Sequence, residues 1–263
     1  MALITEHLQR GGLIEASWVR ASAASFPRHT HDEYVLSANL QGHEQIWLDG
    51  RHHDVPPGAV TLYNPLAVQG SAFGPQGVEY ISLHLSPDAL REVVAEHSLD
   101  NSSGHPVFTQ GVLNDPALLK AIVEFATCDA PQEQEETWLA LLCQLLEQGT
   151  AHRDEHSTGV RHSIAFMREH LHRRIELEEL AAVSGLSKFH FVRCFKKATG
   201  LAPLQYHMQL RLIEARQQLR AGLHPLEVAQ RLNFYDQSHF INAFRRVMGV
   251  TPNSYWSRLH RPA

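Results

Sequence analysis

The sequence has little of what marks secreted, membrane-spanning and many catalytic proteins. Its three cysteines, Cys128, Cys143 and Cys194, are odd in number and widely spaced, which predicts buried thiols in a reducing cytoplasm rather than a disulfide framework. No apolar run approaches the roughly 18 residues of a membrane-spanning helix, and the first residues, Glu6 among them, do not form a signal peptide pattern. GxSxG, HExxH and phosphate-loop motifs are also missing. We therefore expect a cytoplasmic protein that has no membrane partner and is not an enzyme.

Charge is distributed unevenly along the chain. Of the 23 Lys and Arg residues, 16 lie from Val160 onward, together with only 7 of the 28 Asp and Glu residues, which gives +9 there and −14 before it. A length of 263 residues fits two domains, each large enough to bury its own core. The asymmetry favours a polyanionic partner for the C-terminal part, although charged helix surfaces also occur without one.

An internal repeat occupies this basic part. Residues 186–203 and 235–252 share the frame HF-x3-F-[KR]2-x2-G-x2-P at a fixed offset of 49 residues. Agreement in period, aromatic positions and basic pairs is unlikely by chance, so the chain presents the same basic helix twice. The paired phenylalanines of each copy should face the core, and the basic pairs should face the solvent.

Each copy is preceded by a helix and a tight turn. A helical pattern over 177–184 ends at Gly185, which can adopt positive φ, and Ser187 can cap the next helix. In the second copy Asn233 takes the turn position and Asp236 the capping position. This order predicts two helix-turn-helix units. Glu176 is an unusual N-cap, which predicts a weakly capped first helix.

Residues 26–85 show a different periodicity. Short segments such as EYVLSANL and VEYISLHL alternate apolar with polar residues between turn signals, which predicts a β-sandwich or small barrel. After Pro87 the pattern becomes helical. The last of these helices carries an apolar stripe formed by Trp138, Leu141, Leu142, Leu145 and Leu146. That stripe packs either against the barrel or against a second subunit, and the sequence leaves both open.

The repeat, together with DQSHF and GVTP, resembles the DNA-binding domain of the AraC/XylS family of transcription regulators. FPRHTHDEYVLSANLQG and GRHHDVPPGAVTLYNP resemble the paired motifs of a cupin-like barrel, the effector-binding half of many such regulators. The resemblance implies an all-β cupin-like barrel followed by helices over 1–155, which binds effector and dimerises. It also implies an all-α DNA-binding domain over 156–263, with two helix-turn-helix units joined by a long helix. Residues 150–160 are the expected linker.

The resemblance also implies which residues meet DNA. The expected base contacts are Phe189, Val192, Arg193, Gln237, Ser238, His239 and Asn242. Arginine suits guanine, Gln and Asn suit adenine, and Phe suits the thymine methyl, whereas Val offers only an apolar contact. The expected phosphate contacts are Lys188, Lys196, Lys197, Arg245 and Arg246. A solvated helix face is the alternative for each basic residue, and packing or phosphate contact for the two repeat histidines.

The barrel half suggests a ligand site. In metal-binding cupins the first motif supplies two histidines and a glutamate, and the second motif supplies another histidine. Here His29 and His31 remain, but Leu36 and Gln69 take the other two places, so we expect no metal and no cofactor. His52, His53 and His84 could complete a metal site only if the fold brought them together. The candidate effector residues are His29, His31, Trp47, Tyr80, Ser82 and His84, with ordinary packing as the alternative for each.

These observations predict a ligand-responsive transcription regulator, more often an activator by the resemblance. Its expected partners are double-stranded promoter DNA, a small-molecule effector, a second copy of the chain and RNA polymerase. Because the copies differ at Val192/Ile241 and Arg193/Asn242, the two helices should read different half-sites and need an asymmetric sequence. The alternatives are a cupin-type metal-dependent enzyme with a helical accessory domain, and an architectural DNA binder without an effector.

Overall fold

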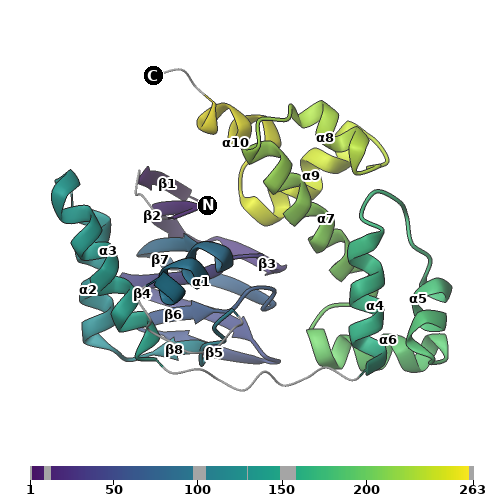
Figure 1. Ribbon diagram of the computed structural model, residues 1–263, viewed down its shortest axis with the longest axis horizontal. Coiled ribbons are helices and arrows are strands. Elements are labelled where there is room, and N and C mark those ends of the chain that lie inside the picture. Colours follow the sequence, from purple (N-terminus) through teal and green to yellow (C-terminus); the bar gives the residue numbers. More distant parts are fainter. Residues whose placement is uncertain (1, 9–12, 97–104, 129, 149–157, 261–263) are drawn as a thin grey trace. The chain divides into compact units, whose positions relative to one another are not determined.

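The computed structural model describes residues 2–8, 13–96, 105–128, 130–148 and 158–260 (Figure 1). Two compact units divide the chain, Met1–Ser25 with Thr30–Arg153 and Asp154–Ala263 with Phe26–His29. The expected domain boundary at 155/156 and most of the expected linker lie outside the described residues. The architecture matches the expected fold class, a sheet-rich N-terminal half followed by a helical C-terminal half.

The N-terminal half contains one antiparallel sheet. Its strands are β1 (Ala2–Leu8), β2 (Glu15–Ser22), β3 (Ser25–His29), β4 (Tyr34–Leu48), β5 (Arg51–Val55), β6 (Val60–Tyr63), β7 (Gln69–Leu85) and β8 (Gly111–Leu113). The order β1-β2-β7-β4-β6-β8 places the two long strands β4 and β7 at the centre. In addition β3 pairs with β7 and β5 pairs with β4, so each long strand takes part in two sets of neighbours.

The long strands change register where they turn from one set of neighbours to the other. The β4–β7 ladder shifts between Asn39 and Gln41 and again between Gly42 and Glu44. Gly42 has a φ of 82°, and a Cβ added there would lie 2.1 Å from the carbonyl oxygen of Gly77. The two backbones therefore approach so closely that only glycine fits at Gly42.

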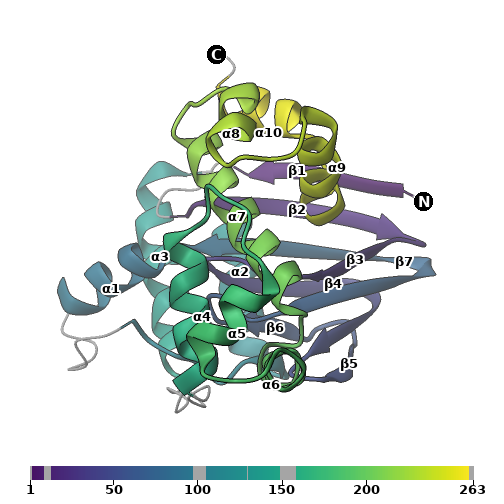
Figure 2. The same ribbon diagram turned by 90° about the vertical axis from the view of Figure 1, so that its right-hand side faces the viewer.

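Two helices cover one face of this sheet. After α1 (Pro87–Glu96), the helices α2 (Pro116–Thr127) and α3 (Pro131–Leu146) lie side by side against it (Figures 1 and 2). Leu141, Leu142 and Leu145 are fully buried in the core with Leu36 and Leu83 of the sheet. The leucine stripe thus packs within its own chain, which is one of the two alternatives left open by the sequence.

The opposite sheet face carries polar side chains beside a smaller apolar cluster that contains Val35. Ile81, Leu83 and Leu85 join the helix-covered core, so Tyr80, Ser82 and His84 between them point the other way, as the alternation predicted. We call this the inner face, defined by Val35, Ser37, Tyr80, Ser82 and His84. Ser37 and Ser82 are cross-strand partners whose hydroxyls lie 3.4 Å apart.

The C-terminal half consists of helices. They are α4 (Thr158–Glu169), α5 (Leu177–Ser184), α6 (Lys188–Thr199), α7 (Pro203–Arg220), α8 (Pro225–Arg231), α9 (Gln237–Met248) and α10 (Pro252–Leu259). The long helix α7 contacts α4 and α6 as well as α8 and α10. Its Arg211 is buried, donates to the carbonyl oxygen of Leu232 and lies over the Phe234 ring, 4.4 Å from its centroid. This contact fastens α7 to the end of α8.

The prediction of buried cysteines was wrong. Cys143 is exposed on α3, and Cys128 and Cys194 are only half-buried. All three are free thiols. The apolar helical patterns around them misled the sequence argument, because a cysteine at the edge of an apolar stripe lies at the boundary between core and solvent.

Candidate nucleic-acid interface and polar sheet face

Helix α6 begins and ends as its sequence dictates. The Ser187 hydroxyl accepts from the backbone N–H of His190, and Gly200 closes the helix with a φ of 78°. Phe191 and Phe195 are fully buried, their rings 5.4 Å apart. With that face fixed in the core, the opposite face of α6 must point into solvent.

Helix α9 repeats this construction. The Asp236 carboxylate accepts from the backbone N–H of His239 at 2.6 Å, and Gly249 ends the helix with a φ of 72°. Phe240 and Phe244 are fully buried. The two copies of the repeat therefore fold alike, with the phenylalanines inward, as predicted.

The turns before these helices also follow the prediction. Gly185 has a φ of 69°, and Asn233 adopts the left-handed conformation with a φ of 51°. The N-terminus of α5 is more firmly capped than the unusual N-cap residue Glu176 predicted. Glu179 accepts from the backbone N–H of Glu176 at 3.0 Å, and hydrogen bonds from Arg173 lower the pKa of Glu179 to about 2.

The expected base-contacting residues lie on the solvent-facing side of both helices. Phe189 is 80% exposed, an unusual state for a large apolar side chain, and Arg193 is exposed one turn further on. Val192 is half-buried. In α9 the expected residues are all exposed: Gln237, Ser238, His239 and Asn242. Each helix thus offers a different set of side chains from one accessible surface.

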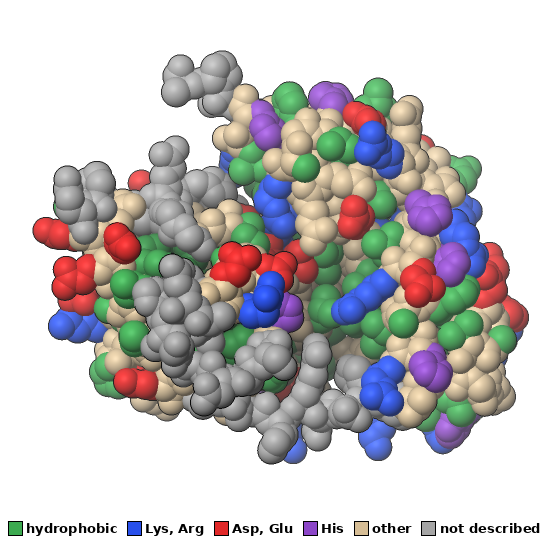
Figure 3. Space-filling view, viewed as in Figure 1, with side chains coloured by type: hydrophobic (Ala, Val, Ile, Leu, Met, Phe, Trp, Pro, Cys, Tyr) green, Lys and Arg blue, Asp and Glu red, His purple; other side chains and the backbone are tan. Residues whose placement is uncertain are grey.

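Basic side chains flank both sets. In the space-filling view Lys, Arg and His side chains are spread over the helical unit (Figure 3). Lys188 forms an ion pair with Glu178 across the first helix pair. The other expected phosphate contacts are exposed and form no salt bridge within the described part of the chain: Lys196, Lys197, Arg245 and Arg246. Such cations remain available to an external anion.

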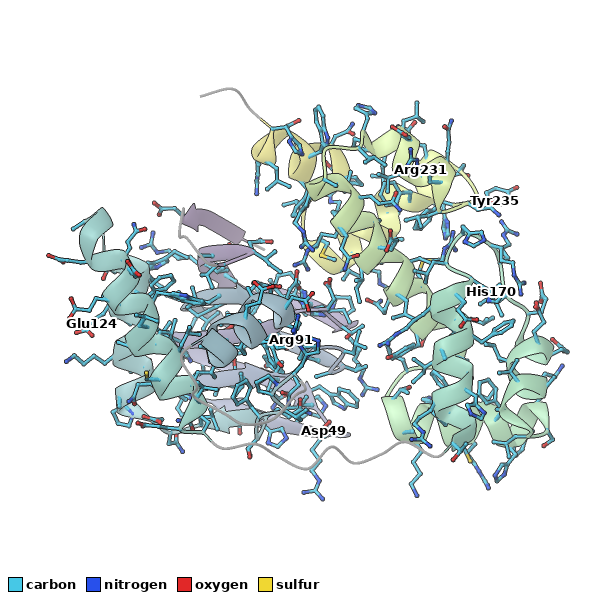
Figure 4. All side chains as sticks on the ribbon, viewed as in Figure 1. Asp49, Arg91, Glu124, His170, Arg231 and Tyr235 are labelled. Atoms are coloured by element: carbon cyan, nitrogen blue, oxygen red, sulfur yellow. The ribbon has the colours of Figure 1, made fainter. Side chains whose placement is uncertain are left out.

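An exposed aromatic ring outside the predicted set lies beside α9. Tyr235 is 75% exposed, and the guanidinium of Arg174 lies 5.2 Å from its ring centroid. The labelled side chain is at the outer edge of the helical unit (Figure 4). The sequence carried a signal, since the turn and cap residues are two positions apart in the first copy (Gly185 and Ser187) and three apart in the second (Asn233 and Asp236), which adds one residue there. A planar ring beside a cation at this position can add a stacking or phosphate contact.

The structure brings only some of the expected effector residues together. Ser82, Tyr80 and His84 share the inner face, and His84 lies close to His31, their ring centroids 5.0 Å apart. The Nδ1 atom of His29 instead forms a hydrogen bond of 2.7 Å with the carbonyl oxygen of Pro27. Trp47 alternates with Ile46 and Leu48, which pack with Val35, and therefore faces away from the inner face.

Two buried acids on this face were missed by the sequence argument. Glu33 is fully buried, with its Oε2 3.7 Å from the Nδ1 atoms of both His31 and His84. Leu36, the position where the cupin pattern would place a glutamate, faces the helix-covered core instead. The acid that meets the histidines comes from the bend before β4, which strand alternation does not describe.

Glu44 is the second acid. It is only 8% exposed, and burial raises its pKa to about 7 against the opposing effect of a hydrogen bond with Ser71. The pKa values of Tyr63 and Tyr80 are raised mainly because both hydroxyls are buried, and the negative charge of Glu44 raises them further. Tyr80 also stacks on Phe73 at 6.0 Å. A buried carboxyl beside two tyrosine rings can orient a polar ligand.

Each half of the chain matches the model of a known protein family. The family model of the AraC-like ligand binding domain matches residues 12–137, and that of a helix-turn-helix domain matches residues 180–258. None of the described helices has the length and apolar character needed to cross a membrane.

Two similar proteins are named as transcription regulators. The uncharacterized HTH-type transcriptional regulator YbfI of Bacillus subtilis is 29% identical over 86% of this chain and 85% of its own. The HTH-type transcriptional activator RhaS of Salmonella schwarzengrund is 27% identical over 89% of this chain and 88% of its own. ToxT from Vibrio cholerae O395 shares the fold, with a TM-score of 0.56 at 11% identity over 94% of this chain and 98% of its own.

Proposed function

The chain belongs to the AraC/XylS family of transcription regulators, and on that premise we propose that it reads an asymmetric promoter site through α6 and α9 in response to a small molecule. The observation that carries this proposal is the exposure of two unlike helix surfaces on one repeated scaffold. Phe189 and Arg193 stand on α6, and Gln237 and Asn242 stand on α9. Two unlike surfaces on one chain require two unlike half-sites.

The roles follow from side-chain chemistry. Arg193 takes guanine O6 and N7, Asn242 or Gln237 takes adenine, and Phe189 presses on a thymine methyl. Val192 contributes only an apolar contact. Ser238 and His239 complete the second surface. The phosphate contacts are the exposed basic residues Lys188, Lys196, Lys197, Arg245 and Arg246, which position the helices without reading sequence.

The inner face of the sheet is the proposed effector site. It combines hydroxyls, imidazoles and aromatic rings with the apolar side chains of Val35, Ile46 and Leu48, the composition that small-molecule sites show. The effector acts only if it prefers one state of the protein over another. The proposed division of labour is effector binding by residues 1–155 and DNA binding by residues 156–263.

Activation, dimerisation and contact with RNA polymerase extend the proposal. Similarity to an activator over most of the chain supports the direction of regulation. Since the leucines of α3 are used inside the subunit, a homodimer would form through other residues. Light scattering of the purified chain, with and without promoter DNA, decides the oligomeric state.

Binding to selected DNA tests the central part of the proposal. Genomic fragments retained by the full chain define a preferred site, and fluorescence anisotropy then measures affinity for every single-base variant of it. Arg193→Ala should weaken binding by about 1–3 kcal/mol and remove the preference at one base pair. Asn242→Ala should do the same at a base pair in the other half of the site.

The control is Lys120→Ala, which removes an exposed positive charge from α2 in the sheet-rich half. This variant should bind like the wild type. If Arg193→Ala weakens binding equally on all sequences, the side chain contacts phosphate and not a base. If both helix variants change the same base pair, the chain does not read two half-sites.

A further inference from the structure

Three ligand-forming side chains converge at one end of the inner face. His31 lies in the connection between β3 and β4, Glu33 just before β4, and His84 near the end of β7. One imidazole nitrogen from each histidine and one carboxylate oxygen lie within 4.8 Å of one another. Among the described residues no other group of three such side chains meets this condition.

The distances suit a shared metal ion better than hydrogen bonds. Both histidine Nδ1 atoms are 3.7 Å from Glu33 Oε2, beyond the range of an N–H···O hydrogen bond, which ends near 3.2 Å. Nitrogen and oxygen ligands bind zinc at about 2.0–2.2 Å, so two ligands of a tetrahedral ion are about 3.4 Å apart. Glu33 Oε2 would have to move only about 0.3 Å closer to each imidazole, and the two imidazole nitrogens, which lie within 4.8 Å of each other, would have to approach by at most about 1.4 Å.

The neighbours of His84 and the burial of Glu33 favour metal binding at this position. His84 Nε2 lies 3.4 Å from the Ser82 hydroxyl, so a proton on Nε2 leaves the lone pair of Nδ1 directed toward Glu33. That Nδ1 is buried and has no hydrogen-bond partner within the described part of the chain. Glu33 is fully buried, and a carboxylate removed from water is stabilised by a cation beside it.

We propose that His31, Glu33 and His84 bind one divalent transition-metal ion of the zinc type. Two imidazoles and one carboxylate disfavour Mg²⁺ and Ca²⁺, which prefer all-oxygen ligand sets. Three protein ligands leave at least one position for water or an exogenous ligand. The proposal reverses our expectation of no metal, which rested on Leu36 and Gln69 and did not consider Glu33. It does not depend on the proposed regulatory function.

Metal retention tests the site directly. The full chain is stripped with a chelator, dialysed against Zn²⁺ in the presence of a competing chromogenic chelator, and analysed by plasma mass spectrometry. The wild type should retain one equivalent more than Glu33→Gln or His84→Gln. Because the chain has 19 histidines, His52→Gln on β5 is the control for adventitious binding and should retain as much as the wild type.

Two further measurements keep the proposal testable if a ligand variant fails to fold. Ser82→Ala leaves all three ligands in place but should weaken zinc affinity about 10- to 100-fold. A chelator should lower the melting temperature of the wild type and leave that of folded Glu33→Gln unchanged. Equal zinc retention by the wild type and the variants, or unchanged affinity in Ser82→Ala, would overturn the site. DNA affinity measured on the same samples reports the regulatory function separately.

Discussion

Replacing Glu44 with glutamine should make the stability of the sheet-rich half less dependent on pH. Glu44 is a buried acid whose pKa is raised to about 7 in the folded chain, whereas the unfolded value is 4.5. Below the unfolded value the carboxyl is protonated in both states, and its contribution to stability is fully present. As the pH rises toward 7 the unfolded chain loses this proton first, so the free energy of unfolding falls.

The size of the effect follows from the two pKa values. Each pKa unit corresponds to about 1.4 kcal/mol, so the wild type loses about 3 kcal/mol between pH 4.5 and pH 7 through this one group. Glutamine has nearly the same shape, keeps an acceptor for Ser71 and carries no charge. Glu44→Gln should therefore be more stable than the wild type by about 3 kcal/mol above pH 7, and about equal to it near pH 4.5.

Urea denaturation followed by tryptophan fluorescence measures this difference. Three of the four tryptophans, Trp18, Trp47 and Trp138, lie in the sheet-rich half and report its unfolding. Glu135→Gln, a change of an exposed acid on α3, is the matched control and should show no such dependence. A stability difference between Glu44→Gln and the wild type that stays constant from pH 4.5 to pH 8 would refute the reasoning.

Other substitutions test the local geometry. Asn233→Gly should change the free energy of unfolding by a few tenths of a kcal/mol, whereas Asn233→Ala should lower it by about 1 kcal/mol because of the positive φ. Asp236→Ala removes the N-cap of α9 and should lower stability by about 1 kcal/mol in urea denaturation. Gly42→Ala should destabilise the sheet-rich half by at least ~2 kcal/mol through its clash with Gly77. Gly50→Ala, which has a similar φ but no atom within 4 Å of an added Cβ, should be milder, and equal effects would exclude the clash.

The sequence predicted most of the helical half because local signals there agree with one another. The cap and turn residues each fix the backbone conformation within one helical turn of their own position. They are Gly185, Ser187, Asn233 and Asp236. The repeat then placed the phenylalanines and the basic pairs on opposite faces. The exposure of the predicted contacts therefore follows from short-range rules.

The inner face was predicted only in part, because it depends on contacts between distant segments. Alternation along β7 placed Ser82 and His84 on one face. It could not place Glu33, which lies outside the strands, or show that Trp47 faces away after the register shifts in β4. Nor could the alternation predict that the pKa of Glu44 is raised, because the burial of its carboxyl depends on the assembled sheet.

The salt dependence of promoter binding tests the central claim most directly. If the five exposed basic residues of α6 and α9 meet phosphates, the logarithm of the binding constant should fall with the logarithm of salt concentration at a slope of about −4 to −5. Replacing Lys197 and Arg246 with alanine should reduce the slope by about 2, with sequence preference kept. A slope near zero for the wild type would contradict DNA binding by these helices.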